Sequence, residues 1–240
     1  MTKKNIDIFT KKIINLLKTK IVGDPYDDVD LGPLASLSAR DEVHEMVIES
    51  IKFGAKLELG GDVSQVKGSF YTITVLSDVK PGMPAFDDEI FGPVFSIIEA
   101  KNDNEAILLA NKSKFGLGAA VFTSDIERGE KIASEEIQTG LCFVNDYVKS
   151  DPRLPFGGIK SSGYGRELSS YGLLEFVKAE LVAKAEGSDV IAETHHCERS
   201  WLNDEAPLNI FPIVLFNTEL SPVIFEVSQR PISLLNDDAP

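Results

Sequence analysis

The sequence predicts an α/β protein in which helices flank a mainly parallel sheet. From residue 94 onward, short apolar runs at 94–100, 119–122 and 141–144 alternate with two helical patterns. Strands that alternate with helices of this length are typical of parallel sheets with right-handed crossovers. With 240 residues, 43% hydrophobic and 26% charged, the chain can bury a sizeable core in one or two domains.

Two amphipathic helices precede this alternating region. Residues 5–20 carry one apolar stripe at helical spacing, formed by Ile6, Phe9, Ile13, Leu16 and Leu17. Gly23-Asp24-Pro25 stops that helix. The second helix has Ser38 as its candidate N-cap and Gly54 as its C′ residue. Its expected buried face consists of Val43, Met46, Val47 and Ile51.

The remaining elements follow from period-two runs and capping residues. Strands are expected at 55–59, ending at Gly60-Gly61, and at 70–76. Asp103 and Asp125 are candidate N-caps of the two crossover helices, which we expect to end at Gly116 and at Gln138-Thr139-Gly140. A Gly, Ser and Pro-rich loop follows Asn145 up to residue 165, and a helix is expected over 167–176.

Charge and cysteine content narrow the class of protein. The net charge of -14 and the isoelectric point near 4.7 argue against nucleic acid or an anionic membrane as a partner, because phosphates are bound by clustered Lys and Arg. No apolar run is long enough for a membrane span. Two cysteines, Cys142 and Cys197, cannot form a disulfide framework, so the expected location is cytoplasmic.

The 87–94 segment, Asp-Asp-Glu-Ile-Phe-Gly-Pro-Val, carries the best candidate for a binding site. The Glu89 carboxylate can accept hydrogen bonds from two neighbouring sugar hydroxyls, and Phe91 can lie against a flat ring. Gly92-Pro93 would fix the backbone that positions both side chains. The alternative interpretation is an acidic turn that leads into a buried strand.

The same segment resembles a signature of the aldehyde dehydrogenase superfamily, and further matches follow in the family's order. These are Gly23-Asp24-Pro25, Gly32-Pro33-Leu34, Gly54-Ala55-Lys56, Gly60-Gly61, Glu105-Ala106 with Ala110-Asn111, Phe115-Gly116-Leu117, Pro155-Phe156-Gly157-Gly158 and Ser162-Gly163-Tyr164-Gly165-Arg166-Glu167. The resemblance covers roughly residues 5–178, and residues 148–156 look most like the succinate-semialdehyde branch.

The resemblance implies the family's catalytic-domain fold and a nicotinamide cofactor, NAD or NADP. Glu89 matches the residue that binds the nicotinamide-side ribose, and Phe91 matches the aromatic that contacts the nicotinamide. The family's nucleophilic cysteine, general-base glutamate, oxyanion asparagine and Rossmann-type domain lie upstream of the matched region, so no catalytic residue is assigned. We therefore expect a truncated aldehyde dehydrogenase that is inactive alone and binds cofactor weakly or not at all.

The alternative function is a non-catalytic interaction module derived from that catalytic domain. A catalytic domain without its cofactor domain exposes apolar surface, and a protein partner would cover it. The two hypotheses differ in one expectation. A truncated enzyme aggregates when pure, whereas an interaction module forms a monomer or a defined complex.

The loop after residue 145 carries the candidate substrate-binding residues. In the family this loop lines the substrate tunnel, which makes Arg153 and Phe156 the candidates. A guanidinium can bind the terminal carboxylate of an acidic aldehyde such as succinate semialdehyde through two hydrogen bonds. The alternative is that Arg153 is an ordinary arginine of a surface loop.

The two cysteines are not expected to be catalytic or to bind metal. Cys142 lies in the predicted strand 141–144 and is interpreted as a small buried hydrophobic residue. Cys197 follows His195 and His196, but adjacent side chains on an extended segment diverge, so no metal site is predicted.

Three regions are expected along the chain. Residues 1–155 are the catalytic-domain portion, 156–186 a return segment with a degenerate oligomerisation strand, and 187–240 an unmatched tail. The tail has nine acids, two arginines and no lysine, an excess of 9 − 2 = 7 negative charges. Five prolines, at 207, 212, 222, 231 and 240, punctuate the tail around its short apolar runs 210–216 and 223–227. Three interpretations of the apolar runs stay open. They are edge strands, they dock on the preceding domain, or they belong to a linker-like, partly disordered tail.

Overall fold

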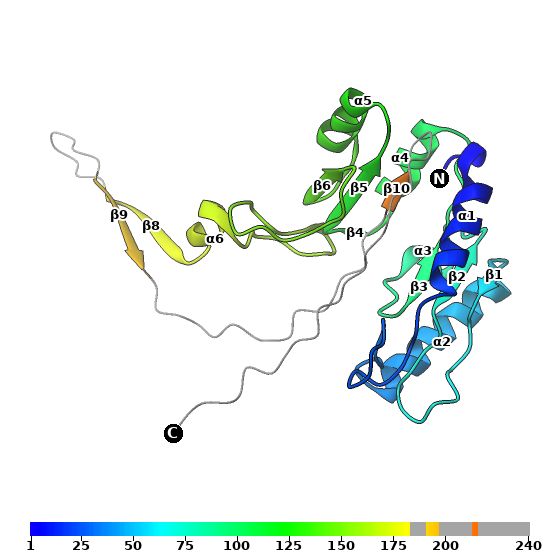
Figure 1. Ribbon diagram of the computed structural model, residues 1–240. Helices are drawn as coiled ribbons and strands as arrows, with labels where there is room; N and C mark the ends of the chain where they lie inside the picture. Colours follow the sequence, from blue (N-terminus) through cyan, green and yellow to red (C-terminus); the bar gives the residue numbers. More distant parts are fainter. Residues whose placement is uncertain (183–190, 197–212, 216–240) are drawn as a thin grey trace, which may run out of the picture. The chain divides into compact units, whose positions relative to one another are not determined.

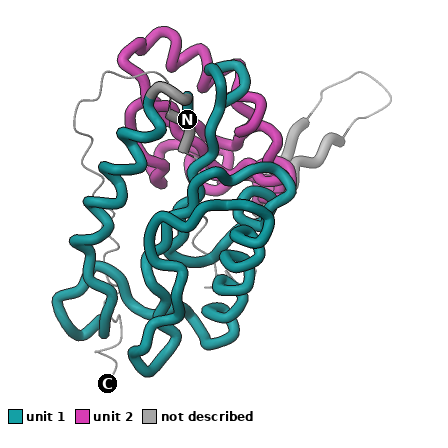
Figure 2. Tube along the Cα trace, turned by 90° about the vertical axis from the view of Figure 1, so that its right-hand side faces the viewer, with its two compact units in different colours: residues 1–106, 217–240 teal, residues 107–216 magenta. Residues whose placement is uncertain are grey.

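A computed structural model describes residues 1–182, 191–196 and 213–215 (Figure 1). The chain divides into two compact units, one built on residues 1–106 and one within residues 107–216 (Figure 2). Each unit combines helices with its own sheet, and parallel strand pairs occur in both. The predicted α/β class is confirmed. The predicted boundaries at residues 155 and 186 remain predictions.

The first unit is a three-stranded sheet between two helices. The strand order is β1 (Lys56–Leu59), β2 (Thr74–Ser77) and β3 (Val94–Ser96), with β1 antiparallel and β3 parallel to β2. Consecutive residues of a strand point to opposite faces of its sheet. Val75 accordingly packs with Ile6 of α1 (Lys3–Leu17), whereas Leu76 packs with Val43 of α2 (Leu37–Lys52). The core of this unit is therefore two apolar layers, one on each face of β2.

The predicted apolar faces of α1 and α2 are confirmed, with one exception. Ile6 is buried in the layer between α1 and the sheet, and Phe9, Ile13 and Leu17 pack against it. In α2, Val43 and Val47 are buried, and Met46 and Ile51 pack against the same cluster. Leu16 is exposed, because it lies beside the stripe rather than within it.

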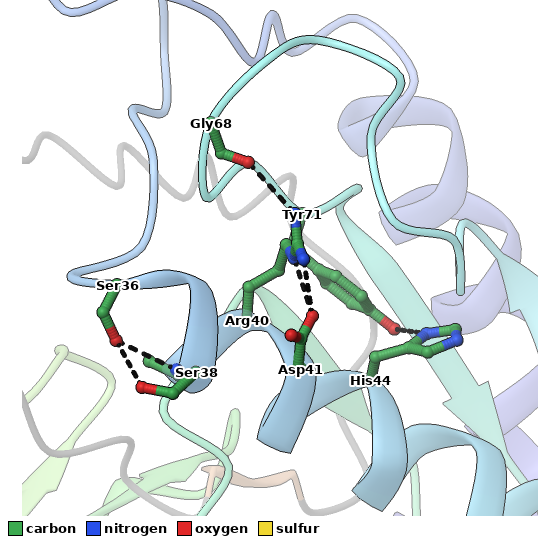
Figure 3. Close-up of polar contacts among 8 residues, drawn as sticks. Ser36, Ser38, Arg40, Asp41, His44, Gly68 and Tyr71 are labelled. Carbon is green, nitrogen blue, oxygen red and sulfur yellow. Dashed lines mark hydrogen bonds and ion pairs between the residues drawn. The ribbon is translucent and has the colours of Figure 1, made fainter.

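Helix α2 begins two residues earlier than Ser38 suggested. The hydroxyl of Ser36 accepts a hydrogen bond from the Ala39 backbone N–H at 3.1 Å, and Ser38 contacts Ser36 from the first turn (Figure 3). Serine at both positions made the sequence ambiguous, and the extended backbone of Ser36 decides it. The predicted C′ residue, Gly54, does follow the helix and has a φ of +106°.

Side chains of α2 hold the connection between β1 and β2. Arg40 donates a hydrogen bond to the Gly68 carbonyl at 3.1 Å and is itself paired with Asp41. One turn later, His44 Nδ1 lies 3.2 Å from the hydroxyl of the buried Tyr71 (Figure 3). Burial raises the pKa of Tyr71 to about 12, so the phenol stays neutral in the core.

The second unit contains a parallel three-stranded sheet with the order β10 (Ile213–Leu215), β5 (Gly118–Phe122) and β6 (Leu141–Val144). Between β5 and β6 the chain forms α5 (Ile126–Lys131), which runs on as one π-helical turn, Ile132–Glu136. Asp125 caps α5 as predicted, since its carboxylate accepts from the Arg128 N–H at 3.0 Å. The predicted helix to Gln138 ends two residues early.

The first of the two predicted crossover helices differs at both ends from its prediction. Helix α4 (Asp103–Asn111) is capped by Asn102, whose side-chain oxygen accepts from the Glu105 N–H, and not by Asp103. It ends at Asn111, whose carbonyl accepts a hydrogen bond from the Lys160 ammonium at 2.8 Å. Gly116, the predicted terminator, lies instead in β4 (Phe115–Gly116), which pairs antiparallel with β7 (Ile159–Lys160).

Other elements are shorter than predicted. The predicted strand 94–100 is regular only over β3, and 70–76 becomes β2 at Thr74–Ser77. The predicted helix 167–176 is α6 (Ser169–Leu174). It leads into β8 (Val177–Val182), which pairs antiparallel with β9 (Ile191–His196). Expectations for Cys197, for the run 223–227 and for the remaining tail lie outside the described residues.

No helix within the described ranges is long and apolar enough to cross a membrane.

A buried hydroxyl joins α2 to the short helix α3 (Pro84–Asp87). Ser50 is fully buried, donates to the Met46 carbonyl at 2.7 Å and accepts from the Ala85 N–H at 2.9 Å. A buried backbone N–H that loses its acceptor costs its full desolvation free energy. Ser50 thereby connects the core helix to the chain that enters the 87–94 segment.

We predict that Ser50→Ala lowers the free energy of unfolding by about 1–3 kcal/mol, because the Ala85 N–H is left buried without an acceptor. Urea titration followed by circular dichroism measures the change. Ser38→Ala, in the exposed first turn of the same helix, is the matched control and should change stability by less than about 0.5 kcal/mol. Equal effects of the two substitutions would contradict this role for Ser50.

Candidate functional site

The 87–94 segment enters β3 from α3, and its side chains alternate between core and surface. Ile90 is buried at 6% exposure and joins the core cluster on the α2 face of the sheet. Glu89, on one side of it, is half-buried, and Phe91, on the other, is 41% exposed. The buried isoleucine therefore anchors the segment and leaves a carboxylate and an aromatic ring two positions apart toward the surface.

The backbone of the segment is held by two consecutive tight turns. The Gly92 N–H donates to the Ile90 carbonyl, and the Val94 N–H donates to the Gly92 carbonyl, each at 2.8 Å. The Pro93 carbonyl then accepts from the Thr74 N–H at 2.8 Å, which starts the β2–β3 ladder. Phe91 is the central residue of the first turn, so the hydrogen bond between Gly92 and Ile90 constrains the direction in which its side chain leaves the chain.

Gly92 is required for packing rather than for an unusual φ. A Cβ at this position would lie 2.9 Å from both methyl groups of Val43 in α2. That distance is too short for carbon atoms, so any side chain would push the segment away from the helix. Gly92, in the Gly92-Pro93 pair, therefore lets the backbone approach α2 closely.

Arg153 lies in an ion pair within its own loop. Its Nε donates to Asp151 Oδ1 at 2.9 Å and its Nη2 to Asp151 Oδ2 at 2.6 Å, while its backbone N–H donates to Oδ1 at 2.9 Å. These hydrogen bonds to Arg153 hold the pKa of the Asp151 carboxyl well below its usual range. The guanidinium remains 86% exposed, and its Nη1 edge faces away from Asp151.

Phe156, the second predicted substrate residue, is half-buried and forms a β-bridge with Glu167. The Phe156 N–H donates to the Glu167 carbonyl at 2.8 Å, and the Glu167 N–H donates back at 2.6 Å. This bridge closes the glycine-rich loop, and the Ser169 N–H adds a bond to the Pro152 carbonyl at 3.0 Å. Arg153 and Phe156 therefore belong to one closed loop of the second unit, whereas Glu89 and Phe91 belong to the first.

Cys142 is half-buried in β6, opposite Ala119 of β5, so the expected strand position is confirmed but full burial is not. The reason is that β6 has β5 as its single strand neighbour among the described residues. Desolvation nevertheless raises the pKa of the Cys142 thiol to about 11. Within the described ranges no cluster of three His, Cys, Asp or Glu side chains could hold a metal ion.

Two residues that support the candidate site were missed in the sequence. Asp151 stands two positions before Arg153, a spacing that allows a side-chain ion pair across an Asp-Pro-Arg turn, and that signal was present. Ser50 gave no signal, because a serine in an amphipathic helix does not reveal which backbone group will approach it.

Comparison with known proteins gives a consistent result over the same part of the chain. Residues 1–182 match the model of the aldehyde dehydrogenase family. Succinate semialdehyde dehydrogenase Sad of Escherichia coli K12, whose name specifies NAD(P)+, is 43% identical over 177 residues, which are 73% of this chain and 38% of that protein. A Deinococcus radiodurans succinate-semialdehyde dehydrogenase, named for NADP+, is 42% identical over 177 residues, covering 73% and 37%.

Solved structures agree with these relatives. The succinic semialdehyde dehydrogenase of Streptococcus pyogenes in complex with NADP+ superimposes with a TM-score of 0.71 at 35% identity, covering 82% of this chain and 40% of that one. A Mycobacterium tuberculosis aldehyde dehydrogenase complexed with NAD+ gives 0.70 at 32% identity, covering 84% and 39%. The chain spans 38% of the length of the first curated relative. The matched residues, the signature segment and the shared fold together place this chain in the aldehyde dehydrogenase family.

Proposed function

We propose that residues 1–182 form a catalytic-domain portion of an NAD(P)-dependent aldehyde dehydrogenase that oxidises succinate semialdehyde to the carboxylate. The observation that carries the proposal is the 87–94 segment, which holds Glu89 and Phe91 two positions apart on an anchored backbone. Relatives named for this substrate are 41–43% identical, which supports the choice of substrate.

The residues present fit the nicotinamide end of the cofactor. An aromatic ring that is 41% exposed can pack against a flat heterocycle, and a half-buried carboxylate can accept from two ribose hydroxyls. We assign Phe91 to the nicotinamide ring and Glu89 to the adjoining ribose. The cofactor, when bound, accepts the hydride. Because these are few contacts, binding by this chain alone is expected to be weak.

Arg153 is proposed to recognise the substrate carboxylate, with Asp151 as its positioning residue. Asp151 uses the Nε and Nη2 side of the guanidinium, so the edge formed by Nη1 and the second N–H of Nη2 can bind another carboxylate. Asp151 also reduces the net charge at that edge. We therefore expect Arg153 to select for a carboxylate by geometry more than by long-range attraction.

The chain is proposed to lack turnover by itself. Oxidation of an aldehyde by covalent catalysis begins with attack of a thiolate on the carbonyl carbon. Cys142 lies in a strand of the parallel sheet, and its thiol has a pKa of about 11, so it is almost entirely neutral near pH 7. A neutral thiol is a poor nucleophile, because the thiolate is the reactive form.

A second candidate function is a non-catalytic interaction module, and the exposed apolar residues around α6 favour it. Leu173 and Leu174 in the helix are 70% and 64% exposed, and Phe176 just after it is 57% exposed. Such a patch is typical of a surface that a protein partner covers. A defined complex or a well-behaved monomer in light scattering favours the module, whereas aggregation favours a truncated enzyme.

We predict that the purified chain produces no NADH or NADPH from succinate semialdehyde, measured as absorbance at the wavelength of the reduced nicotinamide. The physical reason is that Cys142, the thiol among the described residues, has a raised pKa and is therefore mostly neutral near pH 7. Turnover that disappears in Cys142→Ser would contradict this assignment, and the same test with Cys197→Ser covers the other thiol.

We predict that Cys142 is alkylated slowly at neutral pH. In Cys197→Ser, where Cys142 is the remaining thiol, iodoacetamide should react about a hundredfold more slowly in the folded chain than in urea, because the pKa is raised by about two units. Intact-mass spectrometry gives the rate. The rate should rise with pH up to about 11, and a plateau near pH 7 would show an activated thiolate instead.

We predict that Arg153 sets the preference for acidic aldehydes. The test uses a hybrid in which residues 1–182 replace the matching part of Escherichia coli Sad. Arg153→Ala should raise the KM for succinate semialdehyde by about tenfold, the effect of losing one exposed charge-assisted contact, and leave the KM for butanal unchanged.

Lys149→Ala, which removes another exposed cation of the same loop, is the matched control and should alter neither value. Equal effects of Arg153→Ala on both aldehydes would reject its role in substrate recognition. A folded hybrid without activity would contradict the proposed function itself.

A further inference from the structure

A strand from the tail completes the parallel sheet of the second unit. β10 runs parallel to β5, with Ile213 opposite Ala120, Val214 opposite Val121 and Leu215 opposite Phe122 (Figure 1). Strand β6 occupies the other edge of β5. β10 lies outside residues 1–182, the part that matches the family model, so this edge is covered by sequence from beyond the matched region.

The edge that β10 covers is unsuited to exposure. All five residues of β5, Gly118–Phe122, are buried, and the strand carries no polar side chain. An uncovered edge would present a row of unpaired N–H and C=O groups beside apolar side chains, which is a template for pairing with another chain.

The sequence of the covering segment suits a strand that docks on such an edge. Residues 213–215 are Ile-Val-Leu, at the centre of the uncharged run 210–216. β-branched residues such as Ile213 and Val214 have high strand propensity. Acidic residues stand on both sides of the run, at Asp204 and Glu205 before it and at Glu219 after it, the pattern of charges that limits association of apolar strands.

We propose that the edge of β5 opposite β6 is a strand-docking surface and that Ile213–Leu215 is its occupant in cis, a self-complementing strand that excludes other polypeptides. The partner that this surface fits is an extended, uncharged apolar segment entering parallel to β5 over residues 120–122. When β10 leaves, such a segment of another polypeptide takes its place. The inference is independent of the aldehyde dehydrogenase function proposed above.

The test disables β10 within the full chain. Adjacent N–H groups of a strand point to opposite sides, so the double substitution V214P/L215P removes a donor toward β5 whichever residue supplies it. The control is N217P/T218P, which places the same two prolines just beyond β10. The probe is a fluorescein-labelled peptide that copies residues 204–219, with a scrambled peptide for comparison. Fluorescence anisotropy measures binding, and hydrogen exchange by mass spectrometry measures protection of residues 118–122.

In V214P/L215P we expect the amide hydrogens of β5 to exchange at least about tenfold faster than in the unmodified chain. We also expect this variant to bind the peptide at least about tenfold more tightly. Bound peptide should restore protection of β5, and N217P/T218P should behave as the unmodified chain does. Unchanged exchange in β5, or equal peptide binding by the variant and the unmodified chain, would overturn the proposal.

If circular dichroism shows that V214P/L215P does not fold, hydrogen exchange in the unmodified chain tests the proposal instead. There, protection of the amides of residues 213–215 matching that of residues 120–122 supports the self-complementing strand. Exchange of those tail amides at the rate of an unstructured peptide overturns it.

Discussion

The close contact between helix α2 and the backbone of the 87–94 segment is the constraint on which the candidate cofactor site depends. Val43 packs where a side chain of Gly92 would otherwise stand, and Ser50 accepts the N–H of Ala85 just upstream. One contact is apolar and the other is a buried hydrogen bond. Together they place both ends of a short stretch that would otherwise be an exposed turn, and Ile90 anchors its middle.

Helix α2 can hold the 87–94 segment in place because β2 is covered by a helix on each face. Val75 belongs to the layer under α1 and Leu76 to the layer under α2, so neither helix can shift without uncovering apolar surface. Two buried polar side chains of this core have hydrogen-bond partners. Tyr71 contacts His44, and Thr74 accepts from the Gly61 N–H at 2.9 Å. The segment that presents Glu89 and Phe91 is thus attached to a core that has little freedom to rearrange.

The second unit shows a different way of positioning a functional group. Arg153 stands on an exposed loop, so packing does not orient it; Asp151 does, through three hydrogen bonds to one side chain and its backbone. The Phe156–Glu167 bridge closes the loop that carries the pair. An exposed ion pair of this kind contributes little to stability, and its proposed value lies in directing the guanidinium.

The sequence by itself determined the α/β class, the apolar faces of α1 and α2, the position of strand 141–144 and the identity of the 87–94 segment. These follow from periodicity and from residue types whose effect is local, such as the Asp125 cap. Helix ends were less predictable, because neighbouring polar residues such as Ser36 and Ser38, or Asn102 and Asp103, compete for one cap.

Only the tertiary structure decided which groups meet across the chain. The acceptor for the Ala85 N–H, the glycine that Val43 requires, the lysine that ends α4 and the tail strand beside β5 all come from distant parts of the sequence. A pattern along the chain records how a residue prefers to fold locally. It does not record which backbone group or strand edge will need a partner once the chain has packed. The need to pair those buried groups determined these contacts.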